Sequence, residues 1–94
     1  MRVNVRILVP LLAQVIGRRE LEVEFAGQTV SDVVEHLVAQ YGQKARQALL
    51  DETGKLDAVI QVLLNETEWI THDQLDTLLR DGDNVTLMLM VAGG

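Results

Sequence analysis

Cysteine is absent from this chain of 94 residues, and proline and aromatic residues are scarce. Without cysteine the chain can form no disulfide and offers no thiolate as a nucleophile or metal ligand. A chain without thiols suits the reducing cytoplasm, where we expect it. With one proline and 48% hydrophobic residues, the composition predicts a folded domain and not a disordered chain.

Basic residues are outnumbered. Eight Lys and Arg stand against fourteen Asp and Glu, so the formal net charge is −6. Such a surface repels phosphate backbones, so basic protein surfaces are the expected partners and nucleic acid is not. The apolar stretch from Ile7 to Ile16 is interrupted by Pro10 and is too short for a membrane anchor. At this length we expect one domain over residues 1–94, without an enclosed catalytic cavity.

Motifs for cofactor or metal chemistry are also missing. Neither the mononucleotide nor the dinucleotide type of glycine loop occurs, so we expect the chain to bind no ATP or other cofactor itself. The only imidazoles, His36 and His72, stand apart without convergent ligands, and both are predicted to be solvated surface residues rather than metal ligands. Tyr41 and Trp69 are predicted to be packing residues.

Alternating apolar and polar residues predict the strands. Arg2 to Val9 and Glu20 to Phe25 both show a period of two, with arginines on the polar face of one and glutamates on that of the other. Pairing as a hairpin would bring these opposite charges together on an open sheet face. The connection from Pro10 to Arg19 is predicted to be a half-buried apolar loop or a contact site. Further strands are predicted at 59–64, 66–70 and 85–91.

One main helix is predicted between the second and third strands. Apolar residues recur at helical spacing from Val30 to Tyr41, with a capping-box-like start at Thr29 and Asp32 and a glycine stop at Gly42. A shorter helical stretch is predicted over Gln43 to Leu50. The segment from 72 to 79 is predicted to be irregular or a single helical turn that buries Leu75, Leu78 and Leu79.

The last predicted strand carries a surface feature. Val85, Leu87 and Leu89 are predicted to point inward, which would leave Thr86, Met88 and Met90 on the open face. Together with Val59 and Leu63, the two methionines could form a polarizable apolar patch that binds a partner. The alternative is that the methionines pack beneath a loop.

The order strand, strand, helix, strand, short strand, strand indicates an α+β fold, with one main helix on one face of a mixed sheet of four to five strands. Leu79, the turn Asp81-Gly82-Asp83 and the terminal Val91-Ala92-Gly93-Gly94 resemble the ubiquitin-like sulfur-carrier family. That family includes the small subunit of molybdopterin synthase and the thiamin-pathway sulfur carrier. The resemblance spans the whole chain as a pattern and implies a β-grasp fold with a flexible tail at about residues 91–94.

Two features depart from the family pattern. Glu66 and Thr67 stand where a glycine often follows the asparagine that ends the third strand, and residues 88–91 lack the proline common in the molybdopterin branch. These departures leave the pathway open. The length of the chain and the extra helical stretch after Gly42 favour the molybdopterin branch over the thiamin branch.

The resemblance implies that the carboxylate of Gly94 is adenylated by a ubiquitin-activating-type adenylyltransferase and converted to a thiocarboxylate. Its sulfur would pass to the large subunit of molybdopterin synthase or to another sulfur-accepting enzyme. The chain would then be a sulfur-donating subunit and not an enzyme by itself, with ATP and Mg²⁺ supplied through the activating enzyme. Gly93, which lacks a Cβ, would let the terminus thread a narrow channel. The predicted partner-binding residues are Met88, Met90, Val91, Ala92, Val59 and Leu63.

Other functions remain open at this stage. The sulfur could serve thiamin synthesis or tRNA thiolation, or the chain could be a ubiquitin-like modifier joined through Gly94 to lysines. A third alternative is a β-grasp interaction domain that uses only its sheet, for which loss of Gly93 and Gly94 would change nothing. Two terminal glycines arise by chance in about 1 in 200 chains, so their weight comes from the strand that precedes them.

Overall fold

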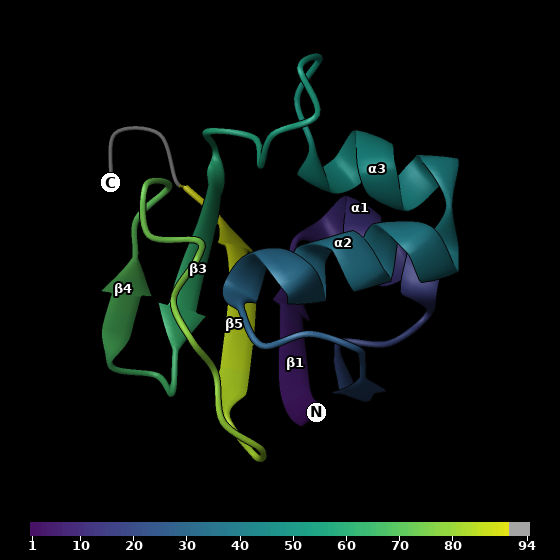
Figure 1. The fold of residues 1–94 in the computed structure, drawn as a ribbon. Coiled ribbons are helices and arrows are strands. Elements are labelled where there is room, and N and C mark those ends of the chain that lie inside the picture. Colours follow the sequence, from purple (N-terminus) through teal and green to yellow (C-terminus); the bar gives the residue numbers. More distant parts are fainter. Residues whose placement is uncertain (91–94) are drawn as a thin grey trace.

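The computed structural model describes residues 1–90, in which three helices accompany one mixed sheet of five strands (Figure 1). The elements in chain order are β1 (Arg2–Leu8), α1 (Pro10–Ile16), β2 (Glu20–Glu24), α2 (Val30–Tyr41), α3 (Gln43–Leu49), β3 (Ile60–Leu64), β4 (Glu68–Ile70) and β5 (Asn84–Leu89). The strand order is β2-β1-β5-β3-β4. The first and last strands therefore lie side by side at the centre, and theirs is the parallel pair. This arrangement is the predicted β-grasp fold.

The core lies between one face of the sheet and the helices. Burial alternates along β1, where Val3, Val5 and Ile7 are buried and their neighbours are exposed. From the other side α2 inserts four buried residues, and Figure 1 shows this helix lying across the sheet. The second face of the sheet carries no helix among the described residues (Figure 1). The apolar residues of the alternating strand pattern and those of the helical pattern therefore pack into one core.

Local hydrogen bonds fix where α2 begins and ends. The backbone N–H of Asp32 donates to Thr29 Oγ1 at 3.1 Å, and the N–H of Thr29 donates to Asp32 Oδ2 at 3.1 Å, which completes the predicted capping box. Gly27 makes room for this carboxylate, because a Cβ on residue 27 would lie 2.6 Å from Asp32 Cβ. At the other end the N–H of Gly42, with φ +79°, donates to the carbonyl of Val38 at 2.8 Å.

The prediction that residues Pro10 to Arg19 form a loop was wrong, because most of this segment is the helix α1. Pro10 occupies the first helical turn, where its missing N–H costs nothing, and Gly17 ends the helix with φ +82°. Seven residues are too few to display a helical period, and only Leu12 is fully buried. The helix packs against β1 and α3.

The segment from His72 to Leu79 is irregular, which is one of the two forms predicted for it. It does not bury all three of the leucines that were predicted to be buried. Leu79 is buried and Leu75 is half-buried, whereas Leu78 is 68% exposed. An isolated bridge pairs the backbone of Leu78 with Thr29, and successive residues in extended backbone point to opposite sides. Burial of Leu79 therefore turns Leu78 outward.

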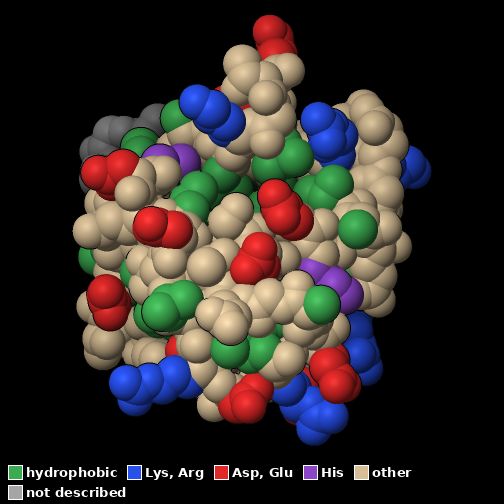
Figure 2. Space-filling model, viewed as in Figure 1, with side chains coloured by type: hydrophobic (Ala, Val, Ile, Leu, Met, Phe, Trp, Pro, Cys, Tyr) green, Lys and Arg blue, Asp and Glu red, His purple; other side chains and the backbone are tan. Residues whose placement is uncertain are grey.

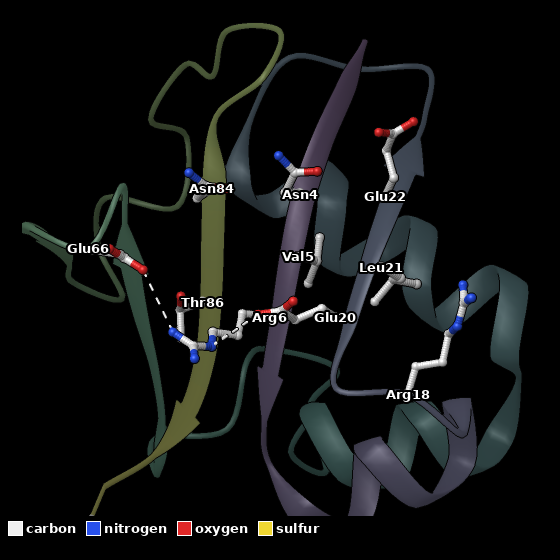
Figure 3. A pocket seen from close by; sticks show the side chains of 10 residues that line it. All are labelled: Asn4, Val5, Arg6, Arg18, Glu20, Leu21, Glu22, Glu66, Asn84 and Thr86. Carbon is white, nitrogen blue, oxygen red and sulfur yellow. Dashed lines mark ion pairs between the residues drawn. The ribbon is translucent and has the colours of Figure 1, made fainter.

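Three predicted environments near the last strand were also wrong. Thr86 is buried rather than open, because the Arg6 side chain reaches across β5 to Glu66 above it (Figure 3). Leu89, expected to point into the core, is exposed at the end of β5. Trp69, expected to be a packing residue, is 55% exposed.

His36 is only partly solvated and not fully so as predicted, since it is half-buried on α2 with its ring centroid 6.3 Å from that of Phe25. His72 is exposed, as predicted. Tyr41 packs partly buried against the core. None of the helices within residues 1–90 has both the length and the apolar character needed to cross a membrane.

Candidate functional site

The central strand β5 carries the chain toward its C-terminus. Met88 stands between Leu8 of β1 and Gln61 of β3 in the sheet register, so this strand is paired on both sides almost to its end. Beyond the strand, the backbone N–H of Met90 donates to the carbonyl of Val59 at 2.7 Å. Hydrogen bonds therefore hold the chain to within four residues of Gly94. The predicted site residues Gly94, Gly93, Val91 and Ala92 lie outside the described residues.

Apolar side chains gather on the open face of the sheet, from the middle of β5 to its end. We call this group the apolar sheet patch; it consists of Leu8, Val59, Leu63, Trp69, Met88 and Met90. Met90 is 56% exposed, and Leu8 and Val59 are exposed as well, whereas Leu63 and Met88 are half-buried. The register places Leu63 opposite Trp69 and Leu8 opposite Met88. The structure thus places Val59, Met88 and Met90 near the end of β5, whereas Leu63 lies beside Trp69 at the level of Thr86, farther back along the sheet.

Two members of the apolar sheet patch were missed from the sequence. Leu8 continues the face of β1 that carries Arg2 and Arg6, and a leucine in that polar alternation was the available signal. Trp69 lies in a strand of three residues, and its neighbours in sequence do not reveal which strand it joins. Its place became known only from the pairing of β4 with β3.

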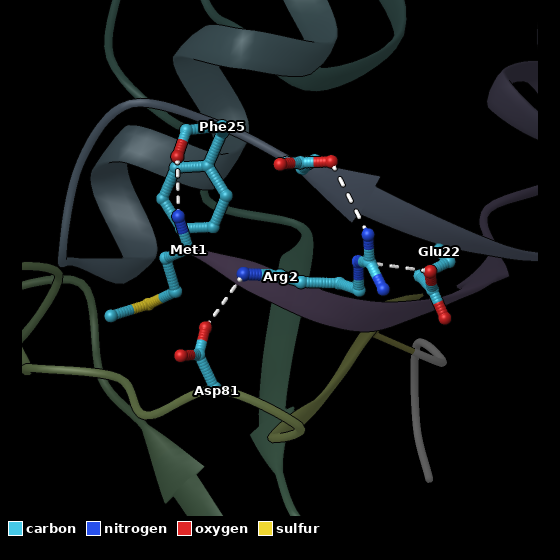
Figure 4. A network of polar contacts seen from close by, with 6 residues as sticks. Met1, Arg2, Glu22, Phe25 and Asp81 are labelled. Carbon is cyan, nitrogen blue, oxygen red and sulfur yellow. Dashed lines mark hydrogen bonds and ion pairs between the residues drawn. The ribbon is translucent and has the colours of Figure 1, made fainter.

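The rest of the open face is polar, and its β1 and β2 part is mostly charged. Arg6 lies between two glutamates, with 3.6 Å from its Nε to Glu20 Oε1 and 3.6 Å from its Nη1 to Glu66 Oε1 (Figure 3). Arg2 Nε lies 3.1 Å from Glu22 Oε1 (Figure 4). The cross-strand pairing predicted from the sequence is confirmed, and Glu66 adds a partner that was not predicted. These side chains are more than half exposed, so each pair stabilises the fold only weakly.

The Asp81-Gly82-Asp83 turn sets where β5 starts. Asp81 Oδ1 accepts the N–H of Arg2 at 2.9 Å, and the N–H of Gly82 donates to the Arg2 carbonyl at 2.8 Å (Figure 4). Asp83 Oδ1 accepts from Asn65 Nδ2 at 3.1 Å, which ties the turn to the end of β3. The motif that carried the resemblance therefore fixes the register of β5 against both neighbours, and with it the place where the chain leaves the sheet.

The turn after β3 explains one departure from the family pattern. Asn65 and Glu66 both adopt positive φ, at 51° and 63°, a region that favours glycine. A glycine after the asparagine would suit this backbone. In this chain Glu66 occupies the position and uses its carboxylate to pair with Arg6.

The described residues bring together few groups for chemistry of their own. Within residues 1–90, no three His, Asp or Glu side chains are grouped as metal ligands. His72 Nε2 lies 3.1 Å from the carbonyl of Asp57, and because a carbonyl only accepts, that nitrogen carries the hydrogen. The features that stand out are thus the apolar sheet patch and the hydrogen bonds that hold the backbone as far as Met90.

Comparisons with known proteins identify the family of the chain. A family model described as ThiS family matches residues 8–94. Sulfur carrier protein CysO of Mycobacterium tuberculosis is 29% identical over 93 residues, which cover 97% of this chain and 99% of the relative. Among solved structures, SAMP1 from Haloferax volcanii has a TM-score of 0.79 at 27% identity, with 100% of both chains covered. The Amycolatopsis orientalis BexX/CysO complex has a TM-score of 0.72 at 29% identity, covering 98% of this chain and 99% of the other.

Proposed function

We propose, from the premise that this chain belongs to the ThiS family and is a ubiquitin-like sulfur carrier, that the carboxylate of Gly94 is the group that carries the sulfur. One carboxylate oxygen attacks the α-phosphorus of ATP on an activating enzyme and releases pyrophosphate. A sulfur nucleophile then displaces AMP, which leaves a thiocarboxylate. The acceptor takes the sulfur, and an oxygen from water restores the carboxylate.

The observation that carries this proposal is the position of β5. The strand is paired on both sides, and the Met90 to Val59 hydrogen bond lies four residues before Gly94. Four residues reach at most about 14 Å. An enzyme that works on Gly94 must therefore approach the end of the sheet where the apolar sheet patch lies. We propose that the activating enzyme and the sulfur acceptor both bind there, and that Val91 and Ala92 extend the contact.

The proposal predicts a thiocarboxylate at Gly94. Protein purified from its own host, or after incubation with a cognate activating enzyme, ATP and a sulfur donor, should react with a thiol-selective alkylating reagent. Mass mapping should place the label on the C-terminal peptide. Because the chain contains no cysteine, any label reports the terminus, and alkylation separates sulfur exchange from methionine oxidation, which changes the mass almost equally.

The matched control is a chain with an alanine added after Gly94, which moves the carboxylate and should remain unlabelled. An unlabelled parent chain, treated with an activating enzyme shown to be active on another carrier, would contradict the proposal. Isopeptide conjugates that form without a thiocarboxylate would instead support the ubiquitin-like modifier. Unchanged partner binding and sulfur delivery after removal of Gly93 and Gly94 would support an interaction domain.

The apolar sheet patch provides a second prediction. Met90→Glu introduces a charge into a surface that the proposed interface would bury, so binding to the activating enzyme should weaken by at least tenfold, since an unpaired buried charge is costly. Leu78→Glu is the matched control, because Leu78 is also an exposed apolar residue but lies in the loop paired with Thr29. Calorimetric titration of both variants measures the difference. Equal affinities of the two variants would rule out this docking surface.

The destination of the sulfur is the finer part of the proposal. We propose molybdopterin synthase as the acceptor, supported by the chain length and by α3, the extra helix after Gly42. In a reconstituted reaction, the thiocarboxylated carrier and a molybdopterin synthase large subunit should convert the sulfur-free precursor into molybdopterin. Sulfur transfer only to a thiamin or tRNA acceptor would reassign the pathway while leaving the carrier chemistry intact. The cytoplasmic location is part of the same proposal and is tested by cell fractionation.

A further inference from the structure

A hollow lies among the helices and shares no lining residue with the apolar sheet patch. It has a volume of about 650 Å³ and lies between α2, α3 and the loop that links α3 to β3. Apolar side chains contributed by α2, the loop and the irregular segment line it: Val34, Val38, Leu50, Leu56 and Leu75. This volume is within the range of sites that hold small organic molecules. We call it the helical-side groove.

The loop over this groove holds its own acidic residue. Leu50 and Leu56 form a bridge, and the N–H of Asp51 donates to the carbonyl of Lys55 at 2.7 Å, so residues 50–56 form a tight hairpin that projects from the molecule (Figure 1). Asp51 Oδ1 accepts the hydroxyl of Thr53 at 2.6 Å and its N–H at 2.8 Å. The carboxylate of Asp51 therefore already has hydrogen-bond partners, foremost the Thr53 hydroxyl, which holds its pKa below the ordinary value.

Three ionic side chains at the groove form no ion pair within residues 1–90. Arg46 comes from the last turn of α3, Glu35 from α2 and Lys55 from the loop that links α3 to β3. The guanidinium of Arg46 lies beside Gly54, with Nη2 3.4 Å from the position that a Cβ would take there, which is an ordinary van der Waals contact. Figure 2 shows apolar atoms beneath the projecting loop, basic side chains on both sides of the loop, and acidic side chains both at its tip and across the apolar atoms from it. The groove therefore has an apolar floor with separated charges.

We propose that the helical-side groove binds a small apolar monocarboxylate. The hydrocarbon part lies on the floor formed by Val34, Val38 and Leu75, and the carboxylate pairs with Arg46, whose planar guanidinium matches two carboxylate oxygens. Glu35 on the α2 side repels a second carboxylate, which restricts the ligand to one. This site shares no residue with the apolar sheet patch, so it is independent of the proposed sulfur chemistry.

The test uses the full chain and three probes of equal length: octanoate, octanol and octylamine. In methyl NMR titrations octanoate should shift the signals of Val34, Val38 and Leu75 and bind at least fivefold more tightly than octanol. Arg46→Gln should remove that preference by weakening octanoate binding. Arg80→Gln is the matched control, since Arg80 is an exposed arginine in the turn before β5, and it should behave as the parent chain.

Several results would overturn this proposal. Octylamine binding as tightly as octanoate would make Glu35 the dominant charge, and shifts confined to the apolar sheet patch would place the binding elsewhere. Persistence of the carboxylate preference in Arg46→Gln would exclude the proposed pairing. Concentration-dependent slowing of translational diffusion that octanoate does not reverse would show that a second copy of the chain, and not the carboxylate, covers the groove. Each outcome is read without an activating enzyme and is therefore separate from the labelling of Gly94.

Discussion

Asp32 shows how much a single side chain does at the start of α2. Its carboxylate accepts hydrogen bonds from the backbone N–H of Gln28 at 2.9 Å and from that of Thr29 at 3.1 Å. The backbone N–H of Asp32 in turn donates to the Thr29 hydroxyl. These hydrogen bonds, with that to Gln28 foremost, hold the pKa of Asp32 below its ordinary value, because they favour the charged form. The helix N-terminus favours the same charge.

The lowered pKa predicts a pH dependence of stability. A carboxyl group whose pKa is lower in the folded state contributes stability above its unfolded pKa and loses that contribution as the pH falls through the folded pKa. Asp32→Asn keeps an acceptor oxygen but removes the charge. The parent chain should therefore lose more free energy of unfolding than Asp32→Asn between pH 7 and about pH 3. Urea unfolding at both pH values measures this, and parallel losses in the two chains would contradict it.

At the scale of elements, α1 and α2 differ in how far their helical structure is determined by their own sequence. The α2 segment has twelve residues, an apolar stripe and both caps, and its bounds could be predicted. The α1 segment has seven residues and no capping side chain, so its helical form depends on contacts with β1 and α3. Short isolated helices are unstable in water, which is why tertiary packing decides here.

The dependence of α1 on packing predicts a contrast between adjacent leucines. Leu12 is completely buried, so Leu12→Ala should lower the free energy of unfolding by about 2 to 5 kcal/mol. Leu11 is exposed on the same helix, and Leu11→Ala should change it by no more than about 0.5 kcal/mol. Denaturant unfolding of the two variants tests this. Similar losses in both would show that α1 is held by its own helical preference and not by the Leu12 contact.

At the scale of the whole molecule, the central position of β1 and β5 unites the two ends of the described chain. These strands have neighbours on both sides, whereas β2 and β4 are edge strands. The parallel pairing of residues 4–8 with residues 84–88 joins segments about eighty positions apart in the sequence. Opening this pair requires most of the core to separate, because the helices pack over it.

Hydrogen exchange should therefore follow strand position. Amides of β1 and β5 should exchange only through global unfolding, while those of β4, a three-residue edge strand, should open locally and exchange at least about a hundredfold faster. Exchange followed by NMR gives these rates residue by residue. Equal protection of β4 and β5 would mean that the sheet opens as a single unit and that edge position has no influence.

Much of the fold and part of the site follow from the sequence because their signals are local. Alternation predicts the strands, the Thr29 and Asp32 pair predicts the start of α2, and arginines facing glutamates predict the hairpin charges. The same alternation predicted that Val59 and Met90 would be exposed. In each case the residues nearby in the sequence are enough to predict which way a side chain points, since side-chain direction has a fixed period in a strand or helix.

The tertiary structure alone decided the features that depend on distant segments. Leu8 and Trp69 join the apolar sheet patch because β1 pairs with β5 and β4 pairs with β3, and nothing near either residue specifies those partners. Thr86 is buried because Arg6 reaches over it to Glu66. The helical-side groove forms where α2, α3 and the loop at 50–56 converge. Local periodicity determines the face on which a residue lies, whereas long-range pairing determines what lies opposite that face.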